Sequence, residues 1–573
     1  MITKTIAVIF RDIAKILEIK GENVFRIRAY ERAARNVESL SEDIQDLIND
    51  DLLRSIPGIG VDLAEKIKEI VKTGRLKFLE DLKNSVPKGL LELLDVPSVG
   101  PKTAKLFYEK LNIRSLAELE KAAKEGKLLE LEGIKEKSVE NILKGIALRK
   151  QGKERMDLAS AILAAGELIE GLKGSAPIKE IMPCGSLRRR KETVRDIDIL
   201  AVSDSPDKVI SAFVSLPQVK DINAKGETKS SIITQDGAQV DLRVVEEKSY
   251  GAALVYFTGS KAFNIKLRQM AIKKGLKVNE YGVFRVKGGK ETYLCGQSEE
   301  EVFKALGLPE IEPELREDTG EIEAALKNEL PELLSLKDIK GDFHCHSRYS
   351  DGNNSILEMA ESARALGYQY LNISDHSQSL KVAGGLSLED LKKKKLEIEK
   401  LNAQLKGFRI LFGTEVDIDS RGRLDYPDSI LAEFDVVVAA IHTGFKQSKK
   451  QITKRLVSAC KNKNVDIIAH PTGKLWGTRE PYEIDWEEFL RAALDCRTAL
   501  EINAYPLRLD LNDLNCRRAK EKGVKLVIST DSHTTDQLKY MHLGVSTARR
   551  GWITKDDVIN TLPYEEVVKL FNK

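Results

Sequence analysis

The C-terminal part of this sequence repeats one local pattern, a short apolar run followed by a helical segment. Seven such runs cover residues 342–346, 368–374, 409–412, 436–441, 465–469, 499–502 and 525–530. Apolar runs of this length favour buried strands, and strands that alternate with helices favour a parallel sheet. We therefore expect a parallel barrel of strands and helices over residues 339–573.

Side chains that bind metals stand at the ends of six of these runs. The chain has seven histidines, and all of them lie after residue 338. The first run ends in His344-Cys345-His346, whose imidazoles would share one face of a strand. The later runs lead to His376, Glu415, His442, His470, Asp531 and His533, whereas the sixth contributes Glu501 and Asn503 instead. Parallel barrels carry functional residues at these strand ends, so the pattern predicts a metal site. His542 stands away from any strand end and is the expected structural histidine.

A second candidate site begins at Asp196-Ile197-Asp198. The apolar run continues to Val202, so a strand would turn both carboxylates to one side and Ile197 into the core. Residues 239–245 alternate around a third carboxylate, Asp241, which a neighbouring strand would bring beside the first two. Three acids can bind two divalent ions, as in two-metal phosphoryl-transfer sites. Taken alone, the Asp-x-Asp pair favours a solvated strand end.

The first 150 residues are predicted to form short helices with a recurring turn. Residues 56–60 precede a helix predicted over 63–73, residues 96–100 precede one over 103–111, and a weaker copy at 131–135 precedes one over 138–150. Gly58, Gly60 and Gly100 would let the backbone approach a ligand, and a helix N-terminus offers free N–H groups to an anion. These units resemble the helix-hairpin-helix motif, which grips DNA phosphates without reading bases. A single turn of this kind could be an ordinary helix connection, but three copies favour non-specific DNA binding.

Composition sets broad limits on the protein. A chain of 573 residues is too long for one core and suggests three to five domains, and a net charge of +3 gives no global argument for nucleic acid. The six cysteines are scattered without Cys-x-x-Cys spacing, so we expect free thiols in a reducing compartment. No run of about eighteen apolar residues occurs, and we expect a soluble, cytoplasmic protein without membrane partners.

The most specific string in the chain is Tyr256-Phe257-Thr258-Gly259-Ser260-Lys261-Ala262-Phe263-Asn264. With Gly185-Ser186 and the three aspartates, it closely resembles the family X DNA polymerases, and the resemblance covers residues 1 to about 316. The resemblance implies that Asp196 and Asp198 hold two Mg²⁺ ions and that Asp241 activates the primer 3′-hydroxyl. It also implies contacts to the incoming nucleotide or the template from Gly185, Ser186, Arg189, Tyr256, Phe257, Gly259, Asn264 and Arg268. A glycine turn, a hydroxyl and arginines also suit phosphate binding by their own chemistry.

The first domain matches this family less well. Lys66 falls where animal members carry the lysine that removes a deoxyribose-phosphate remnant. Asp62 and Arg26 stand where those members carry phosphate-binding lysines, and the carboxylate of Asp62 would repel a 5′-phosphate. Lys66 is therefore an equally good candidate for a lyase nucleophile and for a solvated helix lysine.

The histidine-rich half resembles the PHP domain, a distorted seven-stranded barrel that holds up to three metals and cleaves phosphate esters. Its ligand pattern is filled here by His344, His346, Asp351, His376, Glu415, His442, His470, Asp531 and His533. The resemblance implies one ion on His344, His346, Glu415 and Asp531, a second on Glu415, His442 and His470, and a third on Asp351, His376 and His533. Mixed nitrogen and oxygen ligands suit Mn²⁺, Zn²⁺ or Fe²⁺ better than Mg²⁺. Asn503 and Arg508 are candidates for substrate contacts or for scaffold roles.

Together these features predict a multidomain chain with a helical N-terminal region, an α+β nucleotidyltransferase core and a C-terminal (βα)7-type distorted barrel. The expected segments are a lyase-like domain (1–85), a fingers-like domain (86–150), a palm (151–245), a thumb-like domain (246–316), a linker (317–338) and a PHP domain (339–573). A proline-rich, acidic stretch over 309–338 supports the linker and contains a helix expected at 320–329.

The expected function is a DNA polymerase that fills short gaps during DNA repair, with the PHP half acting as a metal-dependent 3′→5′ exonuclease or phosphodiesterase. Its partners would be gapped or primed DNA and dNTPs, and the protein is expected to be a monomer. Incision at abasic sites is a further activity that the resemblance allows. Two alternatives stay open: the PHP half as a metal-stabilised DNA-binding scaffold, or as a small-molecule phosphatase of the histidinol-phosphate kind.

Overall fold

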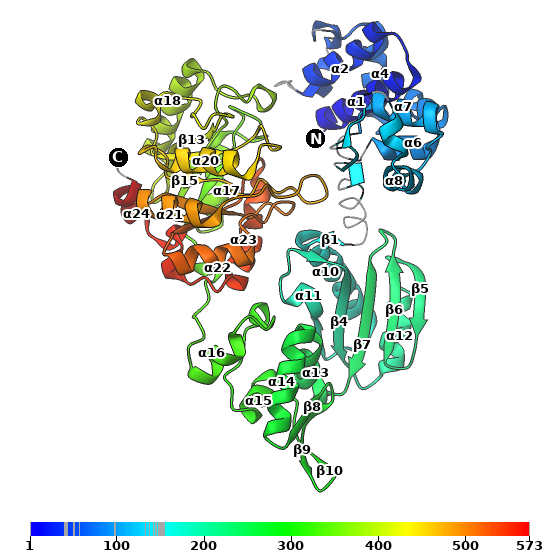
Figure 1. Ribbon diagram of the computed structural model, residues 1–573, viewed down its shortest axis with the longest axis vertical. Coiled ribbons are helices and arrows are strands. Elements are labelled where there is room, and N and C mark those ends of the chain that lie inside the picture. Colours follow the sequence, from blue (N-terminus) through cyan, green and yellow to red (C-terminus); the bar gives the residue numbers. More distant parts are fainter. Residues whose placement is uncertain are drawn as a thin grey trace. The chain divides into compact units, whose positions relative to one another are not determined.

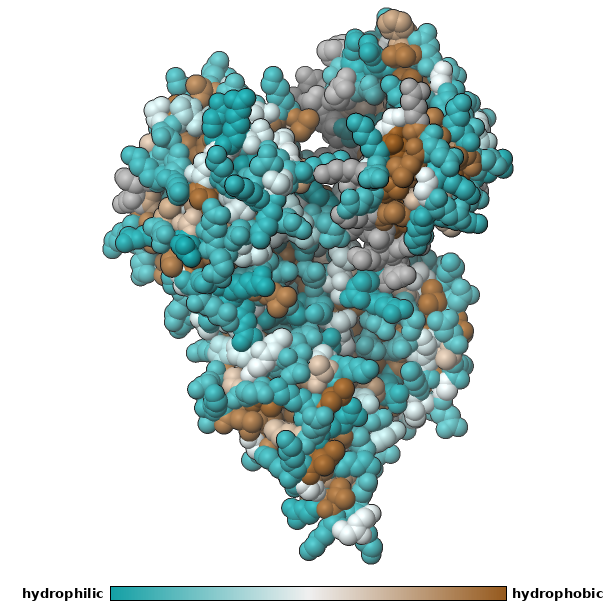
Figure 2. Space-filling model, viewed as in Figure 1, coloured by the Kyte–Doolittle hydropathy of each residue, from teal (hydrophilic) through white to brown (hydrophobic). Residues whose placement is uncertain are grey.

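The computed structural model describes residues 2–38, 44–49, 52–56, 58–94, 96, 99–131, 133–136, 138–140, 142–143, 146 and 155–571. The chain divides into two compact units, residues 1–152 and 153–573 (Figure 1). Hydrophilic residues cover most of the face seen in Figure 2, as expected of a chain in which 32% of residues are charged. Within the described ranges, no helix has the length and apolarity needed to cross a membrane.

The first unit is helical throughout its described residues, as expected. Its helices are α1 (Ile2–Lys20), α2 (Val24–Glu38), α3 (Ile44–Asn49), α4 (Val61–Thr73), α5 (Lys77–Asn84), α6 (Lys88–Leu93), α7 (Pro101–Leu111) and α8 (Leu116–Lys124). Phe10, Ile67 and Phe107 are fully buried in its single apolar core. The helices predicted over 63–73 and 103–111 are confirmed, each starting two residues earlier. The third, predicted over 138–150, lies partly outside the described residues.

The second unit begins with a five-stranded sheet, in the region predicted as the palm. Its strands run in the order β2 (Glu180–Pro183), β4 (Asp196–Val202), β7 (Gln239–Val245), β6 (Lys229–Thr234) and β5 (Val219–Lys225). The strands predicted at 196–202 and 239–245 are confirmed, and they pair in parallel. Helices α10 (Leu158–Ser175) and α12 (Pro206–Val214) bury Leu168 and Phe213 in the same core as Ile197. The short helix α11 (Gly185–Arg188) precedes β3 (Thr193–Val194), which pairs with β1 (Met156–Asp157) from the start of the unit.

A smaller subdomain follows, in the region predicted to be thumb-like. It contains α13 (Tyr250–Thr258), α14 (Lys261–Lys273), the antiparallel strands β8 (Leu276–Asn279), β9 (Gly282–Lys287) and β10 (Lys290–Cys295), and α15 (Glu299–Ala305). The expected linker helix is present as α16 (Glu321–Lys327).

The C-terminal half is a parallel barrel whose strands follow in chain order. They are β11 (Gly341–Cys345), β12 (Tyr370–Ile373), β13 (Arg409–Asp417), β14 (Val436–Ala440), β15 (Ile467–Ile468), β16 (Ala499–Asn503) and β17 (Leu526–Ser529), and the seven predicted strands are confirmed. A parallel bridge between Cys345 and Ser532 connects the first strand to the segment after the last one. The helices are α17 (Ile356–Ala365), α18 (Leu388–Gln404), α19 (Asp428–Leu431), α20 (Lys449–Cys460), α21 (Trp486–Cys496), α22 (Asp513–Lys522), α23 (Met541–Arg550) and α24 (Tyr564–Phe571).

The sheet region and the barrel share apolar packing. Leu509 and Leu543 come from the barrel half but are buried in the core of the five-stranded sheet region, where Tyr540 also packs. Lys474 of the barrel pairs with Glu192 at 2.6 Å. The two halves of the second unit therefore pack through a partly apolar, partly ionic interface.

Candidate metal centres

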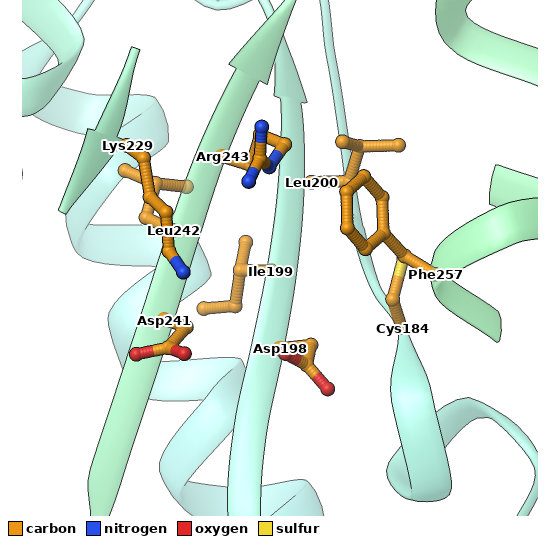
Figure 3. A pocket seen from close by; sticks show the side chains of 9 residues that line it. All are labelled: Cys184, Asp198, Ile199, Leu200, Lys229, Asp241, Leu242, Arg243 and Phe257. Carbon is orange, nitrogen blue, oxygen red and sulfur yellow. The ribbon is translucent and has the colours of Figure 1, made fainter. Parts of the chain in front are cut away.

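Three carboxylates meet on two adjacent strands of the five-stranded sheet. Strands β4 and β7 are in register so that Asp198 stands directly opposite Asp241, while Asp196 stands opposite Gln239. Figure 3 shows Asp198 and Asp241 at the same end of the pocket, below Lys229 and Arg243. The neighbouring strand thus brings Asp241 to the first pair, as the alternation of the two segments predicts.

The environment of Asp198 resists a negative charge. Burial, together with the nearby charges of Asp196 and Asp241, raises the pKa of Asp198 to about 7. A carboxylate cluster of this kind is relieved by divalent cations, which supply the missing positive charge. The donor set, oxygen atoms from three carboxylates, fits Mg²⁺.

Gly185 is required by the close approach of α11 to this cluster. The residue has φ +61°, and a Cβ atom added there would lie 2.2 Å from Asp198 Oδ2. Ser186 lies beside it in α11, and Arg189 follows the helix. Arg189 donates from Nη1 to Thr258 O at 2.6 Å and from Nε to Glu317 at 2.9 Å.

The other residues of the predicted nucleotide site gather around the junction of α13 and α14. The side-chain amide of Asn264 donates to Tyr256 O at 2.7 Å and to Gly259 O at 3.0 Å. A Cβ atom on Gly259 would meet Phe263 and Asn264, which explains the glycine. Arg268 donates to Asn264 O at 3.2 Å.

Phe257 joins this junction to the carboxylate pocket. Its ring lines the pocket together with Asp198 and Asp241, and the guanidinium of Arg243 lies over it at 5.0 Å (Figure 3). Phe257 therefore stands between the aspartates and the α13–α14 junction.

The predicted DNA-binding glycines lie at helix N-termini in the first unit. Gly58 has φ +83°, and Gly60 and Gly100 cap α4 and α7. Both residues are exposed, and a Cβ atom on either would meet no described atom within 4 Å.

Lys66 is on α4 and is paired rather than free. Its amine hydrogen-bonds to Asp62 on the same helix and lies 5.0 Å from the centre of the Phe78 ring. Asp62 and the Phe78 ring therefore both engage the amine that a lyase nucleophile would need free.

All of the predicted barrel ligands converge at one mouth of the barrel. Counting by two along a strand leads from inward apolar residues to ligands: Leu411 to Glu415, Val438 to His442 and Val527 to Asp531. Three clusters have ligand atoms close enough for a shared ion: His346, Asp351, His376 and His533; His344, His346 and Asp531; and His376, Glu415 and His442. His346 and His376 each belong to two clusters, which strand positions alone could not reveal.

Glu415 stands at the centre of these clusters. Its Oε1 lies 2.9 Å from His470 Nε2 and 3.1 Å from His442 Nε2. Its Oε2 lies 2.8 Å from His376 Nδ1 and 3.4 Å from His344 Nε2. One carboxylate can therefore bridge two positions. The cluster around Glu415 and His442 contains His376, however, where the expected grouping has His470.

The clusters have the properties of a metal site. Within the described part of the chain, Nε2 of His344 and both ring nitrogens of His346 are buried without a hydrogen-bond partner. Burial, with the charges of His533 and His376, lowers the pKa of His346 to about 4, so its ring is a neutral ligand at physiological pH. Buried polar atoms of this kind need a partner, and divalent ions fit both the geometry and the nitrogen and oxygen donors.

Two carboxylates contact the ligand histidines from behind, a role that the sequence pattern does not predict. Glu501 accepts from His344 Nδ1 at 2.7 Å and from the backbone N–H of His470 at 2.6 Å. Asp417 lies 3.2 Å from His442 Nδ1. Each fixes the ring so that its other nitrogen faces the cluster, a common second layer around metals. The sequence does offer a signal for each: Glu501 ends the sixth apolar run, and Asp417 follows Glu415 by two residues.

The two residues proposed for substrate contact line the same mouth. Arg508 pairs with Asp531 at 3.3 Å, and its buried Nη1 has no hydrogen bond among the described residues. Asn503 bridges Glu501 and Asp531 with its amide. His542 lies on α23, 2.6 Å from Lys539 O, and belongs to none of the three clusters.

Four family models match the chain. They describe a helix-hairpin-helix domain over residues 1–76, a SAM-like helix-hairpin-helix tandem over 90–148, a DNA polymerase beta thumb over 253–317 and a PHP domain over 342–504.

Individual relatives match the whole chain or one half of it. A DNA polymerase/3′-5′ exonuclease PolX from Bacillus subtilis (strain 168) is 42% identical over 567 residues, which cover 98% of both chains. DNA polymerase lambda of Rattus norvegicus is 27% identical over 334 residues, 53% of this chain and 54% of that protein. A probable phosphatase of Thermoanaerobacter sp. (strain X514) is 32% identical over 232 residues, 38% of this chain and 89% of that protein.

The match to the Bacillus protein runs through the carboxylate cluster, the thumb and the histidine barrel alike. The chain therefore belongs to the family X DNA polymerases that carry a C-terminal PHP domain.

Proposed function

We propose that this protein is a template-directed DNA polymerase that fills short gaps and a metal-dependent 3′→5′ exonuclease that trims 3′ ends. One observation carries the proposal. The chain has a carboxylate centre in the sheet region and a separate histidine-rich centre in the barrel, and it is similar over 98% of its length to a DNA polymerase/3′-5′ exonuclease. We propose that the domains are divided at the limits of the six segments expected from the sequence.

In the proposed polymerase, Asp196 and Asp198 hold two Mg²⁺ ions, and Asp241 accepts the proton of the primer 3′-hydroxyl. When bound there, the ions would supply positive charge to the reacting phosphate and to the leaving pyrophosphate. The chain itself positions the reactants: Gly185 and Ser186 offer N–H and hydroxyl donors, and Arg189 offers a guanidinium. Catalysis of this kind rests on alignment and charge neutralisation.

The α13–α14 junction is proposed to select the nucleotide. Tyr256, Phe257 and Gly259 would line the sugar, where a close backbone excludes a 2′-hydroxyl. Asn264 is held by Tyr256 O and Gly259 O, which fixes its side chain for a minor-groove contact. Arg268 would contact the template.

In the proposed nuclease, the barrel ligands would hold two to three divalent ions, and these would supply the charge that activates a water and neutralises the phosphate. Mn²⁺, Zn²⁺ or Fe²⁺ suit these ligands better than Mg²⁺. Glu501 and Asp417 orient His344 and His442 from behind. Arg508 and Asn503 would hold the phosphate of the terminal nucleotide.

The test is a gap-filling and degradation assay on DNA with a one-nucleotide gap, with Mg²⁺ or Mn²⁺ and with or without dNTPs. Asp196→Ala should abolish nucleotide addition and leave 3′→5′ degradation largely intact. His344→Ala should abolish degradation and leave addition largely intact. If either variant loses both activities while remaining folded, two independent centres are the wrong description.

A small-molecule phosphatase is the second candidate for the barrel half, because a probable phosphatase matches 38% of the chain. Comparing histidinol phosphate with a 3′-tailed oligonucleotide as substrate separates the two. The scaffold alternative predicts bound metal without turnover of either substrate.

The partners of this proposed enzyme are gapped or primed DNA and dNTPs. We propose that the helix N-termini at Gly60 and Gly100 hold DNA phosphates and that a monomer is sufficient, because one chain supplies every side chain of both centres. We propose a cytoplasmic location, because the proposed enzyme must reach a DNA substrate. The pairing of Lys66 with Asp62 argues against a strong lyase activity.

A further inference from the structure

One arginine of the PHP half reaches into the polymerase half. Arg550 is the last residue of α23, and its side chain is 5% exposed. Its Nη1 donates to the backbone carbonyl of Arg189 at 2.7 Å and to Glu317 Oε1 at 3.0 Å. Its Nη2 donates to Asp513 of α22 at 2.5 Å. Arg550 therefore ties the barrel to the segment that follows α11.

Glu317 connects Arg550 to the proposed triphosphate arginine. The same oxygen, Oε1, accepts from Nε of Arg189 at 2.9 Å. The side chains of Glu317 and Arg189 are 16% and 12% exposed, so this contact is shielded from solvent. Oε1 of Glu317 also lies 3.7 Å from Lys191 Nζ, so one carboxylate divides its charge among Arg189 and Lys191 of the polymerase half and Arg550 of the PHP half.

Arg189 is held at two of its three guanidinium nitrogens. Nε is bound to Glu317 and Nη1 to Thr258 O, and Nη2 takes part in neither bond. Loss of Arg550 would leave the charge of Glu317 to Arg189 at 2.9 Å and to Lys191 at 3.7 Å, and it would remove the donor from the carbonyl of Arg189. Both changes oppose the binding of an anionic triphosphate, the first by neutralisation and the second by loosening the backbone.

We propose that Arg550 is a positioning residue for nucleotide addition, a part of the polymerase centre supplied by the PHP half. It acts through Glu317 and the backbone of Arg189 and does not touch the nucleotide. This inference rests on the proposed polymerase function and on the role of Arg189 in it.

The test measures KM for dNTP and kcat on one-nucleotide-gapped DNA for wild type, R550M, R550K and the control R549M. Arg549 is the matched control, because it lies in the same helix and interface but pairs with Glu314 at 2.7 Å and not with Glu317. R550M should raise KM by about ten- to a hundredfold, the worth of one charge-assisted hydrogen bond, with kcat and exonuclease rate within about threefold. R550K should recover part of the affinity, and R549M should leave KM unchanged.

A second variant tests the route through Glu317. In E317Q the shared charge is gone, so adding R550M should raise KM by much less than it does in the wild-type background. The inference is overturned if R550M leaves KM unchanged, if R549M raises it equally, or if the effects of R550M and E317Q are additive. If R550M also loses exonuclease activity, an unchanged KM in R550K overturns it instead. A wild-type enzyme that adds no nucleotide would refute the proposed function itself, which distinguishes that failure from a failure of the inference.

Discussion

Lys394 should be among the most important single side chains for the stability of the barrel. It is fully buried on α18, and its amine lies 2.9 Å from Asp375 Oδ2. The amine also donates to Ile373 O at 2.8 Å and to Gly413 O at 2.9 Å, so its three donors join strands β12 and β13. Removing one partner of a buried ion pair costs about 3–5 kcal/mol, because the other charge stays buried without compensation.

The assay for this prediction is urea unfolding of Lys394→Met followed by tryptophan fluorescence. The three tryptophans, Trp476, Trp486 and Trp552, all lie in the barrel half, so their signal reports on it. With a slope of roughly 3 kcal/mol per molar urea, the midpoint should fall by about 1 to 1.7 M. Lys395→Met is the control, since Lys395 is 38% exposed and its pair with Glu433 contributes less than about 1 kcal/mol. Equal midpoints for the two variants would refute the reasoning.

Four further predictions concern the two centres. Glu501→Gln should weaken Mn²⁺ binding by the barrel about 10- to 100-fold in calorimetry, because His344 loses its orienting carboxylate; an unchanged affinity would contradict this. The pKa of Asp198 is about 7, so protons compete with Mg²⁺ below that pH. As the pH increases toward 7, the affinity of the palm for Mg²⁺ should increase by up to about tenfold per pH unit, and above pH 7 it should level off. Gap filling at limiting Mg²⁺ measures this affinity. Without metal, the raised pKa means that the folded state binds more protons than the unfolded state between about pH 4 and 7. Through Asp198, the free energy of unfolding should therefore fall with rising pH in that window, and Asp198→Asn should remove this contribution to the slope. Gly185→Ala should reduce nucleotide addition by at least about tenfold, because its Cβ would collide with Asp198, whereas Gly174→Ala on α10 has open space and should not.

Much of the site could be predicted because strand periodicity fixes which side chains share a face. The alternation of apolar and acidic residues places Asp196, Asp198 and Asp241 on one face if their two strands are neighbours. The pairing of β4 with β7 meets that condition. The barrel ligands were likewise predictable, since each continues an inward row of apolar residues to the strand end.

The sequence does not predict contacts that depend on the orientation of an imidazole ring or on segments far apart in the chain. The sharing of His346 and His376 between clusters depends on how each imidazole is turned. The link from Arg550 through Glu317 to Arg189 joins residues far apart in the chain with no local pattern to mark it. The small sheet of β8, β9 and β10 was also not foreseen, because most of its side chains are exposed and its apolar alternation is weak.

The burial of Leu509 and Leu543 in the core of the sheet region has a consequence for how such a gene can change over time. The histidines at the barrel mouth can be replaced one by one with little effect on that core. Deleting the barrel would instead uncover apolar surface on the remaining enzyme, with a risk of aggregation. In a lineage that no longer needs the nuclease, the metal-binding side chains are therefore expected to be lost long before the PHP domain is deleted. Related proteins without nuclease activity should usually keep the full-length chain.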